Sequence, residues 1–442
     1  MTALFSVNDS LTNKISYYHL MFLMASLPFD MFYSHLILVS YGIHTLIHLK
    51  KGRLKELWKL RTGVLQSVFF ITLLSTIYAI NQHEAFNEWG KQVTIFLFPI
   101  FFCLNPLDIN KYKPQLLLSF SLVCTVTILY LYLDAFLTIR HYHLPYSIIM
   151  SGVFTNHNFS QPIEIHATFF SMQLALSLVY ILSVLIKEQE KYKRLFYLAC
   201  SAILSAGLIQ LCSKSVFVTL VILINIAVPY YLLKGKMRRR FVLISGSLSL
   251  LVITAILSSV TLRERYVNQL KDDFSAQRVD ETNDGRLARW KVVVDYIGEA
   301  PVIGYGAGSE IGLLQDGFFD KKLYNSYLNR LNSHNQYLSI MLKSGALGLL
   351  IYLATLAFGF NIAFRRKDLF FLTFMTTVAI VSMSENLLDV DKGIMFYAFF
   401  FSFFIFSSRK PETNIITKTY NSEVPDQRPK ITYAGNELVV SN

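Results

Sequence analysis

Residues 115–137 read QLLLSFSLVCTVTILYLYLDAFL, with a single acidic residue, Asp134, in the run. The hydrocarbon core of a bilayer is about 30 Å thick, and about 20 apolar residues in an α-helix cross it. The rest of the chain is similar, since 53% of its 442 residues are hydrophobic and only 16% are charged. A soluble protein carries about 25% charged residues. The composition therefore excludes an ordinary soluble enzyme, a disordered regulator and a fibrous protein.

Comparable apolar runs recur along the chain and predict an all-α polytopic membrane protein with about 12 transmembrane helices. They lie at residues 16–31, 32–49, 62–81, 90–104, 115–137, 164–186, 195–212, 215–233, 241–261, 334–361, 369–385 and 393–408. The segment before the first run, with Asp9 and Lys14, lacks the basic region and cleavage site of a signal peptide. We therefore expect the first helix to remain in the mature protein. The four cysteines show no spacing of a disulfide framework or a zinc site.

Lysine and arginine predict the orientation of these helices, because cytoplasmic loops retain positive charge. One set of alternate connections holds clusters such as the six basic residues from Lys50 to Arg61 and the five from Lys234 to Arg240. The short connections on the other side hold only Lys91, Arg140, Lys214 and Lys392. We expect both termini to be cytoplasmic. The net charge of +12 is thus a topology signal, and its dispersal over several loops argues against nucleic-acid binding.

The predicted helices divide the chain into four parts. Residues 1–261 hold helices 1–9, residues 262–333 form a large external loop or cap, and residues 334–408 hold helices 10–12. Residues 409–442 are polar and are expected to be a disordered cytoplasmic tail. A polar helix is expected from Arg263 to Phe274 in the cap, and helical spacing recurs later in Trp290, Val293, Val294 and Ile297.

The densest candidate site lies in this cap, at Asp284-Gly285-Arg286-Leu287-Ala288-Arg289-Trp290. The guanidinium groups of Arg286 and Arg289 could hold a phosphate or pyrophosphate, because the fork of an arginine matches phosphate oxygens. The glycine run Gly304-x-Gly306-x-Gly308 would let backbone amides approach an anion. The alternative is that the arginines reach lipid headgroups and the glycines form a turn.

Three further residues stand at the predicted external ends of apolar runs. His334, where the cap re-enters the membrane, carries an imidazole that could accept a proton from a hydroxyl. Lys214 is a lone cation in Cys212-Ser213-Lys214-Ser215, and His166 begins the sixth run. Each could instead be a polar anchor at the membrane surface. The acidic pairs Asp389-x-Asp391 and Asp272-Asp273 are too short to predict a metal site.

Together these motifs resemble the O-antigen ligase and polymerase superfamily. The resemblance rests on the order of Gly285-Arg286-x-x-x-Trp290, Pro301-x-x-Gly304-x-Gly306-x-Gly308, His334-Asn335-x-Tyr337-Leu338 and Gly345-x-x-Gly348-Leu349. The His166-Ala-Thr-Phe169-Phe170 and Ser213-Lys214-Ser215 segments occupy the expected order upstream. The resemblance spans roughly residues 150–400, and its C-terminal half is the more specific.

The resemblance implies a glycosyltransferase of GT-C-like architecture in the bacterial inner membrane. Such an enzyme moves a glycan from undecaprenyl pyrophosphate to an acceptor hydroxyl on the periplasmic face, without a cofactor or a metal. The acceptor is another glycan or the lipid A core. Carried over to this chain, Arg286 would bind the pyrophosphate and His334 would be the catalytic base. The family usually has arginine where this chain has Lys214, which keeps the charge but lacks the bidentate fork.

Two other functions stay open at this point. A repeat-unit polymerase would use the same donor, with a second carrier-linked glycan as the acceptor. A polysaccharide transporter or flippase would more often show internal repeats and helices broken at mid-membrane. No repeat is evident, and the candidate residues lie mainly at the external face.

Overall fold

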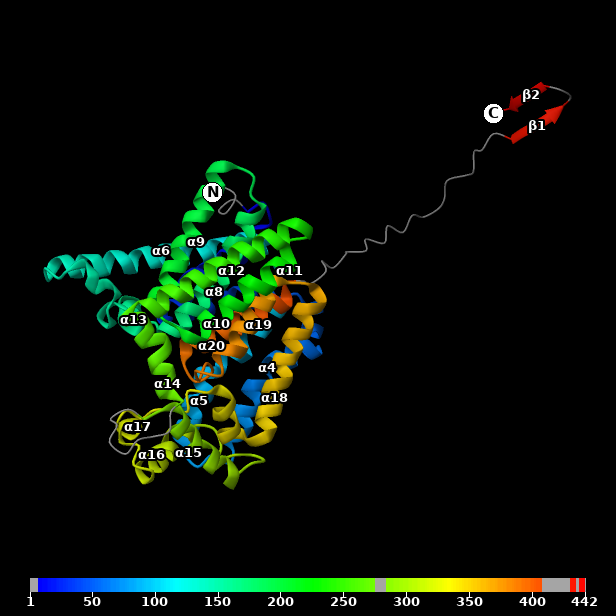
Figure 1. Ribbon diagram of the computed structural model, residues 1–442. Helices are drawn as coiled ribbons and strands as arrows, with labels where there is room; N and C mark the ends of the chain where they lie inside the picture. The colour runs from blue at the N-terminus through cyan, green and yellow to red at the C-terminus, as the bar shows by residue number, and fades with distance from the viewer. Residues whose placement is uncertain (1–6, 275–283, 408–429, 435–436, 442) are drawn as a thin grey trace. The chain divides into compact units, whose positions relative to one another are not determined.

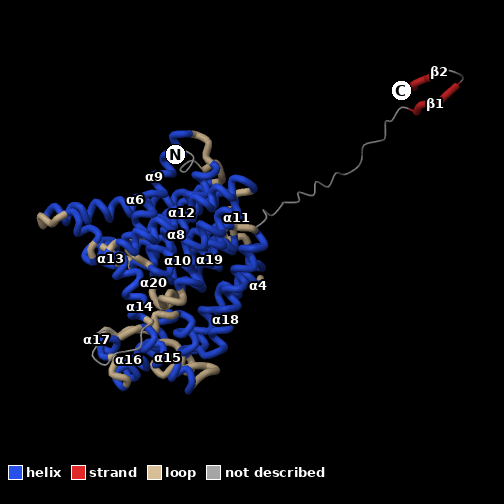
Figure 2. Tube along the Cα trace, viewed as in Figure 1, coloured by secondary structure: helices blue, strands red, loops and turns tan. Residues whose placement is uncertain are grey.

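The computed structural model describes residues 7–274, 284–407, 430–434 and 437–441. The chain separates into two compact units, Met1–Arg409 and Lys410–Asn442. In the first unit a bundle of helices carries three cap helices at one end, α15 (Arg286–Glu299), α16 (Glu310–Asp320) and α17 (Tyr324–Leu328) (Figure 1). Loops gather around these three helices, whereas the bundle is helical almost throughout (Figure 2).

Each of the twelve predicted apolar runs overlaps a helix of the bundle. The helices up to the cap are α2 (Leu11–Ser26), α3 (Met31–Ile47), a 3-10 helix (Lys51–Trp58), α4 (Leu60–Thr76), α5 (Gln82–Leu104), α6 (Ile109–His141), 3-10 turns (Tyr146–Met150, Gly152–Phe154 and Gln161–Ile163), α7 (His157–Ser160), α8 (Ala167–Lys187), α9 (Lys191–Leu211), α10 (Lys214–Ile222), a π-helical turn (Leu223–Ala227), α11 (Val228–Leu232) and α12 (Gly235–Ser258). After the cap come α18 (Gln336–Arg366), α19 (Leu369–Val381) and α20 (Asp391–Phe406).

The described part of the chain contains six helical segments long and apolar enough to cross a membrane: α6, α8, α9, Lys214–Leu232, α12 and α18. A seventh is added if Lys51–Trp58 and α4, which meet at an angle of 61°, form one span. The helices α3 and α19 are apolar but shorter. The predicted all-α polytopic membrane protein is confirmed, while the number of twelve spans stays a prediction.

The helices α20 and α12 show the two extremes of burial in the bundle. Every residue from Gly393 to Phe406 in α20 is buried, and its phenylalanine rings pack on α5. The apolar helix α12 buries only Ser245 and Ile256, and most of its leucines are exposed. Apolar side chains on an outer face are expected where lipid replaces water as the solvent. The large hydrophobic fraction therefore serves both a core and a lipid-facing surface.

The cap folds as short helices with a small core of its own. Its helices are α13 (Val260–Arg263), a π-helical turn (Glu264–Asn268), α14 (Gln269–Asp273), α15 (Arg286–Glu299), α16 (Glu310–Asp320) and α17 (Tyr324–Leu328). The first three replace the polar helix expected from Arg263 to Phe274. The cap core contains Val292, Val293, Leu314, Phe318 and Leu323 and continues into Leu342 of α18. This continuity fixes the cap on the bundle.

The helix α18 is broken at Gly345, and the loop 301–308 fills the break. Gly345 has φ +61° and ψ −163°, and an added Cβ would lie 2.2 Å from the Val302 carbonyl, so the position requires glycine. The Ala346 amide donates to the Pro301 carbonyl at 2.9 Å. The loop backbone thus satisfies groups that the kink leaves without helical partners.

The interpretation of the glycine run as a cradle for an external anion is wrong. The Gly306 amide donates to the Lys343 carbonyl at 2.8 Å, and the Gly308 amide donates to the Glu88 carboxylate at 2.6 Å. Gly306 has φ +92°, and a Cβ there would lie 2.3 Å from the Ala79 Cα. The glycines are needed because three stretches of backbone meet, and their amides already have partners within the protein.

In the second unit, β1 (Lys430–Ala434) and β2 (Glu437–Ser441) pair as antiparallel strands, with Lys430 opposite Ser441. The remainder of the tail that we expected to be disordered lies outside the described residues.

Candidate active site

The predicted site residues stand at the beginnings of four helices. His166 immediately precedes α8, Lys214 is the first residue of α10 and Arg286 the first of α15. His334 lies two residues before α18, in the left-handed region with φ +46°, and its amide donates to the Asn332 side chain at 2.9 Å. Helix N-termini carry partial positive charge from unpaired amides. The starts of α10 and α15 have no side-chain cap and would therefore favour a negatively charged ligand, whereas the Asn335 side chain already accepts from the first amides of α18.

The imidazole of His334 is held by a carboxylate that the sequence analysis did not single out. Nδ1 of His334 lies 3.3 Å from Oε2 of Glu385, in the loop after α19, and the Thr168 hydroxyl donates to Oε1 at 3.4 Å. Burial by itself raises the pKa of Glu385, but the hydrogen bond to His334 and nearby positive charge lower that pKa to about 2. An ionised carboxylate only accepts hydrogen bonds. Nδ1 therefore carries the hydrogen in the neutral ring, and Nε2 is left as a proton acceptor.

Arg286 is held by the same loop as His334. Its NH1 group donates to the carbonyl oxygen of Ser384 at 3.0 Å, one residue before Glu385. Its Nε lies 3.5 Å from Oδ2 of Asp273, and Nζ of Lys214 lies 3.2 Å from the same oxygen. Three predicted residues are thus brought together through two acidic ones. Their side chains are 21–27% exposed, so they remain accessible to a ligand.

Arg289 lies one helical turn after Arg286 and is only 6% exposed. Its Nε and NH1 groups have no hydrogen-bond partner among the described residues. Burial lowers the pKa of Arg289 to about 10, with a further contribution from the positive charge of Arg286. A buried guanidinium without hydrogen bonds is costly. A bound anion would offset that cost, so Arg289 is a stronger candidate than its place beside the motif indicated.

His166 contacts a second histidine at the edge of this group. The ring centroids of His166 and His157 are 4.1 Å apart, and those of His166 and Phe169 are 5.1 Å apart. A positive charge on His166 contributes to the low pKa of Glu385. His157 also lines a cavity of about 550 Å³ between the loop at Gly152 and the cap segment near Val260. This cavity adjoins the candidate site, at the junction between the bundle and the cap.

A second polar cluster surrounds Lys343 of α18, and the sequence analysis did not predict it. Nζ of Lys343 lies 2.7 Å from Glu88 and 2.8 Å from Asp389, with Glu310 at 3.9 Å. Glu310 also accepts hydrogen bonds from the Ser333 amide and the Asn386 side chain. The four charged groups are therefore paired with one another across α5, α16, α18 and the loop after α19. Lysine is rarely buried unless it is paired. The presence of Lys343 inside the apolar run 334–361 is therefore the sequence feature that could have indicated this cluster.

A cavity of about 720 Å³ opens beside the Lys343 cluster. Acidic, amide and basic side chains line it, among them Glu84, Asn87, Asp316, Arg330 and Asn332. Asp389 accepts hydrogen bonds from Lys343, Ser339 and Asn386. Asp391, in contrast, begins α20 and is exposed. Within the described residues no group of three histidine, cysteine or acidic side chains could hold a metal ion.

The fold defines a multi-pass membrane protein, and the cationic cluster at the cap is a candidate site for a negatively charged ligand. Residues 199–353, about a third of the chain, match the family model described as O-antigen ligase. This segment runs from α9 into α18 and includes Lys214, Arg286, Arg289 and His334. The match confirms the resemblance of this segment to the O-antigen ligase-like family and indicates a membrane enzyme of the ligase or polymerase type. A search of curated proteins found no matching relative.

Proposed function

We propose that this protein is a membrane glycosyltransferase that joins a glycan from undecaprenyl pyrophosphate to an acceptor hydroxyl. The reaction takes place at the periplasmic face of the bacterial inner membrane, and both termini are cytoplasmic. The observation that carries the proposal is the attachment of Arg286 and His334 to adjacent residues, Ser384 and Glu385, of one loop. This arrangement supports a shared site for a candidate base and a candidate phosphate-binding side chain.

In the proposed reaction the acceptor oxygen attacks the anomeric carbon of the sugar attached to the diphosphate. The bond from that carbon to the phosphate oxygen breaks, and its electron pair leaves with the diphosphate. Nε2 of His334 takes the proton of the acceptor hydroxyl. Glu385 acts as a positioning residue, because it orients the imidazole through Nδ1 and stabilises the imidazolium that forms.

The cations of the site stabilise the diphosphate as it gains negative charge. Arg286 and Lys214 lie near its proposed position, since they converge on Asp273, and Arg289 adds buried donors that lack partners among the described residues. His166 is proposed to bind the substrate from the start of α8. Positioned charges aimed at a leaving group are among the largest contributions to catalysis. The lipid part of the carrier would lie against the bundle.

The proposal is tested with the purified full chain, reconstituted with carrier-linked glycan and an acceptor. Replacing His334 by Ala is expected to lower the transfer rate by about 10²–10⁴-fold, the usual contribution of a general base. His141→Ala is the matched control, because His141 is exposed at the end of α6 and belongs to the predicted external side. Full transfer by the His334 variant would remove the proposed base.

The same site chemistry would serve a polymerase, whose acceptor is a second carrier-linked glycan. Surface polysaccharide from a deletion strain separates the two reactions on a gel. Loss of a ligase leaves long polymer on its carrier, whereas loss of a polymerase leaves single repeat units. Movement of carrier lipid across vesicles without any joining of glycans would favour a transporter instead.

A further inference from the structure

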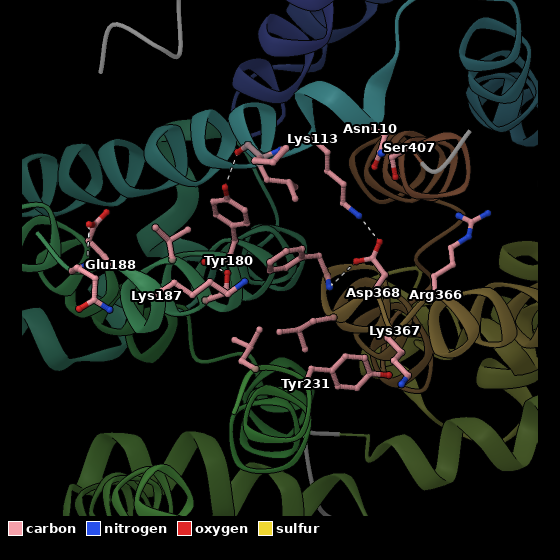
Figure 3. Close-up of a pocket in the computed structure, with 18 residues that line it drawn as sticks. Asn110, Lys113, Tyr180, Lys187, Glu188, Tyr231, Arg366, Lys367, Asp368 and Ser407 are labelled. Carbon is pink, nitrogen blue, oxygen red and sulfur yellow. Dashed lines mark hydrogen bonds and ion pairs between the residues drawn. The ribbon is translucent and has the colours of Figure 1, made fainter. Parts of the chain in front are cut away.

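A pocket of about 810 Å³ lies at the end of the bundle away from the cap. Its residues come from the start of α6, the end of α8, the end of α11 and the junction of α18 with α19 (Figure 3). Both α8 and α18 begin beside the candidate active site and end at this pocket. The 21 residues of α8 span roughly 30 Å at about 1.5 Å per residue, which matches the hydrocarbon core of a bilayer.

The pocket therefore lies at the level of the lipid headgroups on the opposite membrane face. Five predicted apolar runs begin or end among its residues: 115–137, 164–186, 215–233, 369–385 and 393–408. The distribution of lysine and arginine predicts that this face is cytoplasmic. A ligand of this pocket would accordingly come from the inner leaflet or from the cytoplasm.

The rim of the pocket carries an excess of positive charge. Lys113 forms an ion pair with Asp368, whose other oxygen accepts from the Phe370 amide. Glu188 accepts from two amides that follow it in the chain. Both acidic groups of the pocket thus already have hydrogen-bond or ion-pair partners within the protein.

Three cations of the rim remain for a ligand. Figure 3 shows Lys187 on one side of the pocket and Arg366 and Lys367 on the other. Arg366 is held in place through its NH1 group, which donates to the carbonyls of Phe404 and Ile405. Lys187 and Lys367 are exposed, and neither forms a side-chain hydrogen bond or ion pair with the described residues.

The wall below these cations is apolar, with Leu117, Val184, Leu232, Leu369 and Phe370. A free phosphate ion would leave that wall empty, whereas a phospholipid would cover it with the first carbons of its acyl chains. Basic pockets between membrane helices on the cytoplasmic side suit anionic lipid headgroups. We propose that this pocket binds an anionic phospholipid of the inner leaflet, with its phosphate between Lys187, Arg366 and Lys367.

The test measures retention of lipid by the purified full-length protein in detergent. Native mass spectrometry compares phosphatidylglycerol with phosphatidylcholine on the wild type and on the double variant Lys187→Gln, Lys367→Gln. The wild type is expected to prefer phosphatidylglycerol. The double variant is expected to bind it about 25-fold more weakly, since each cation near a membrane surface contributes about fivefold.

The matched control is the double variant Lys236→Gln, Arg239→Gln, which removes the same charge from exposed residues of α12 outside the pocket. It is expected to bind phosphatidylglycerol like the wild type, and all three proteins are expected to unfold at the same temperature in phosphatidylcholine. Equal loss in both double variants, or none in the first, would overturn the proposal. Displacement of phosphatidylglycerol by inorganic phosphate at equal concentration would overturn the lipid as the ligand. Because the readout is lipid binding, failure here leaves the proposed transfer reaction untouched.

Discussion

Two polar clusters lie where the cap meets the bundle, and they differ in how their charges are balanced. Around Lys343, three carboxylates face one cation, and hydrogen bonds from the surrounding backbone and amide groups satisfy them. Around His334, the cations Lys214, Arg286 and Arg289 face the carboxylates of Asp273, Asp284 and Glu385, yet two nitrogen atoms of Arg289 lack partners among the described residues. The charged groups of the first cluster are satisfied within the protein, whereas we propose that an anion binds to the second. The comparison thus predicts a role in stability for the first cluster and a role in binding for the second.

The largest expected effect is on folding, at Lys343. Replacing it by Met leaves the buried carboxylate of Glu310 and the partly buried carboxylates of Glu88 and Asp389 close together without their cation. Removing one partner of a buried ion pair costs about 3–5 kcal/mol. We expect a clear fall in the thermal unfolding temperature in detergent. Lys91→Met is the control, since Lys91 is exposed in the same cavity. A variant at Lys343 that folds normally but loses transfer would place this lysine among the substrate-binding residues.

The second effect is on transfer, at Arg286. Replacing it by Ala removes a positioned donor to the leaving diphosphate, and such donors contribute about 10²–10³-fold to the rate. The unfolding temperature is expected to change little, because the side chain is partly exposed. Arg140→Ala serves as the control, because Arg140 is an exposed arginine of α6 on the predicted external side. Equal transfer by the Arg286 variant and the wild type would contradict the assignment of this cluster to binding.

A smaller effect is expected at Lys214, where the family resemblance would lead us to expect arginine. Lys214→Met is expected to lower transfer about tenfold, because one charge of several is lost, and a factor of ten corresponds to about 1.4 kcal/mol. Lys214→Arg is expected to keep or raise the wild-type rate, since it restores the bidentate fork. The rate is measured at low donor concentration, where binding limits it. Wild-type transfer by the Met variant would show that Lys214 only pairs with Asp273.

The smallest effect concerns pH and Glu385. Its pKa in the folded protein is about 2, against an ordinary value of 4.5, because the hydrogen bond to His334 and positive charge outweigh burial. A lowered pKa contributes stability that is present above about pH 4.5 and is lost as the pH falls towards 2. The difference in unfolding temperature between the wild type and Glu385→Gln is therefore expected to shrink from pH 6 to pH 3. A difference that stays constant over this range would contradict the lowered pKa of Glu385.

The sequence by itself determined the helices, because a long apolar run forms a helix in a membrane without depending on distant parts of the chain. Each predicted run overlaps a helix, and the order of the Arg286, glycine and His334 motifs indicated the family before any contact was known. Local composition was sufficient for these predictions, since they depend on neighbours in the chain.

Only the tertiary structure decided which charges face one another. Glu385 stands 51 positions after His334, and Glu88 stands 255 positions before Lys343, so no local pattern pairs them. The sequence left the glycine run open between an anion cradle and a turn for the same reason, because the backbone that it approaches belongs to Ala79 and to the break at Gly345. A short sequence shows which side chains can carry charge. Whether such a charge is neutralised within the protein or left for a substrate depends on packing between segments far apart in the chain.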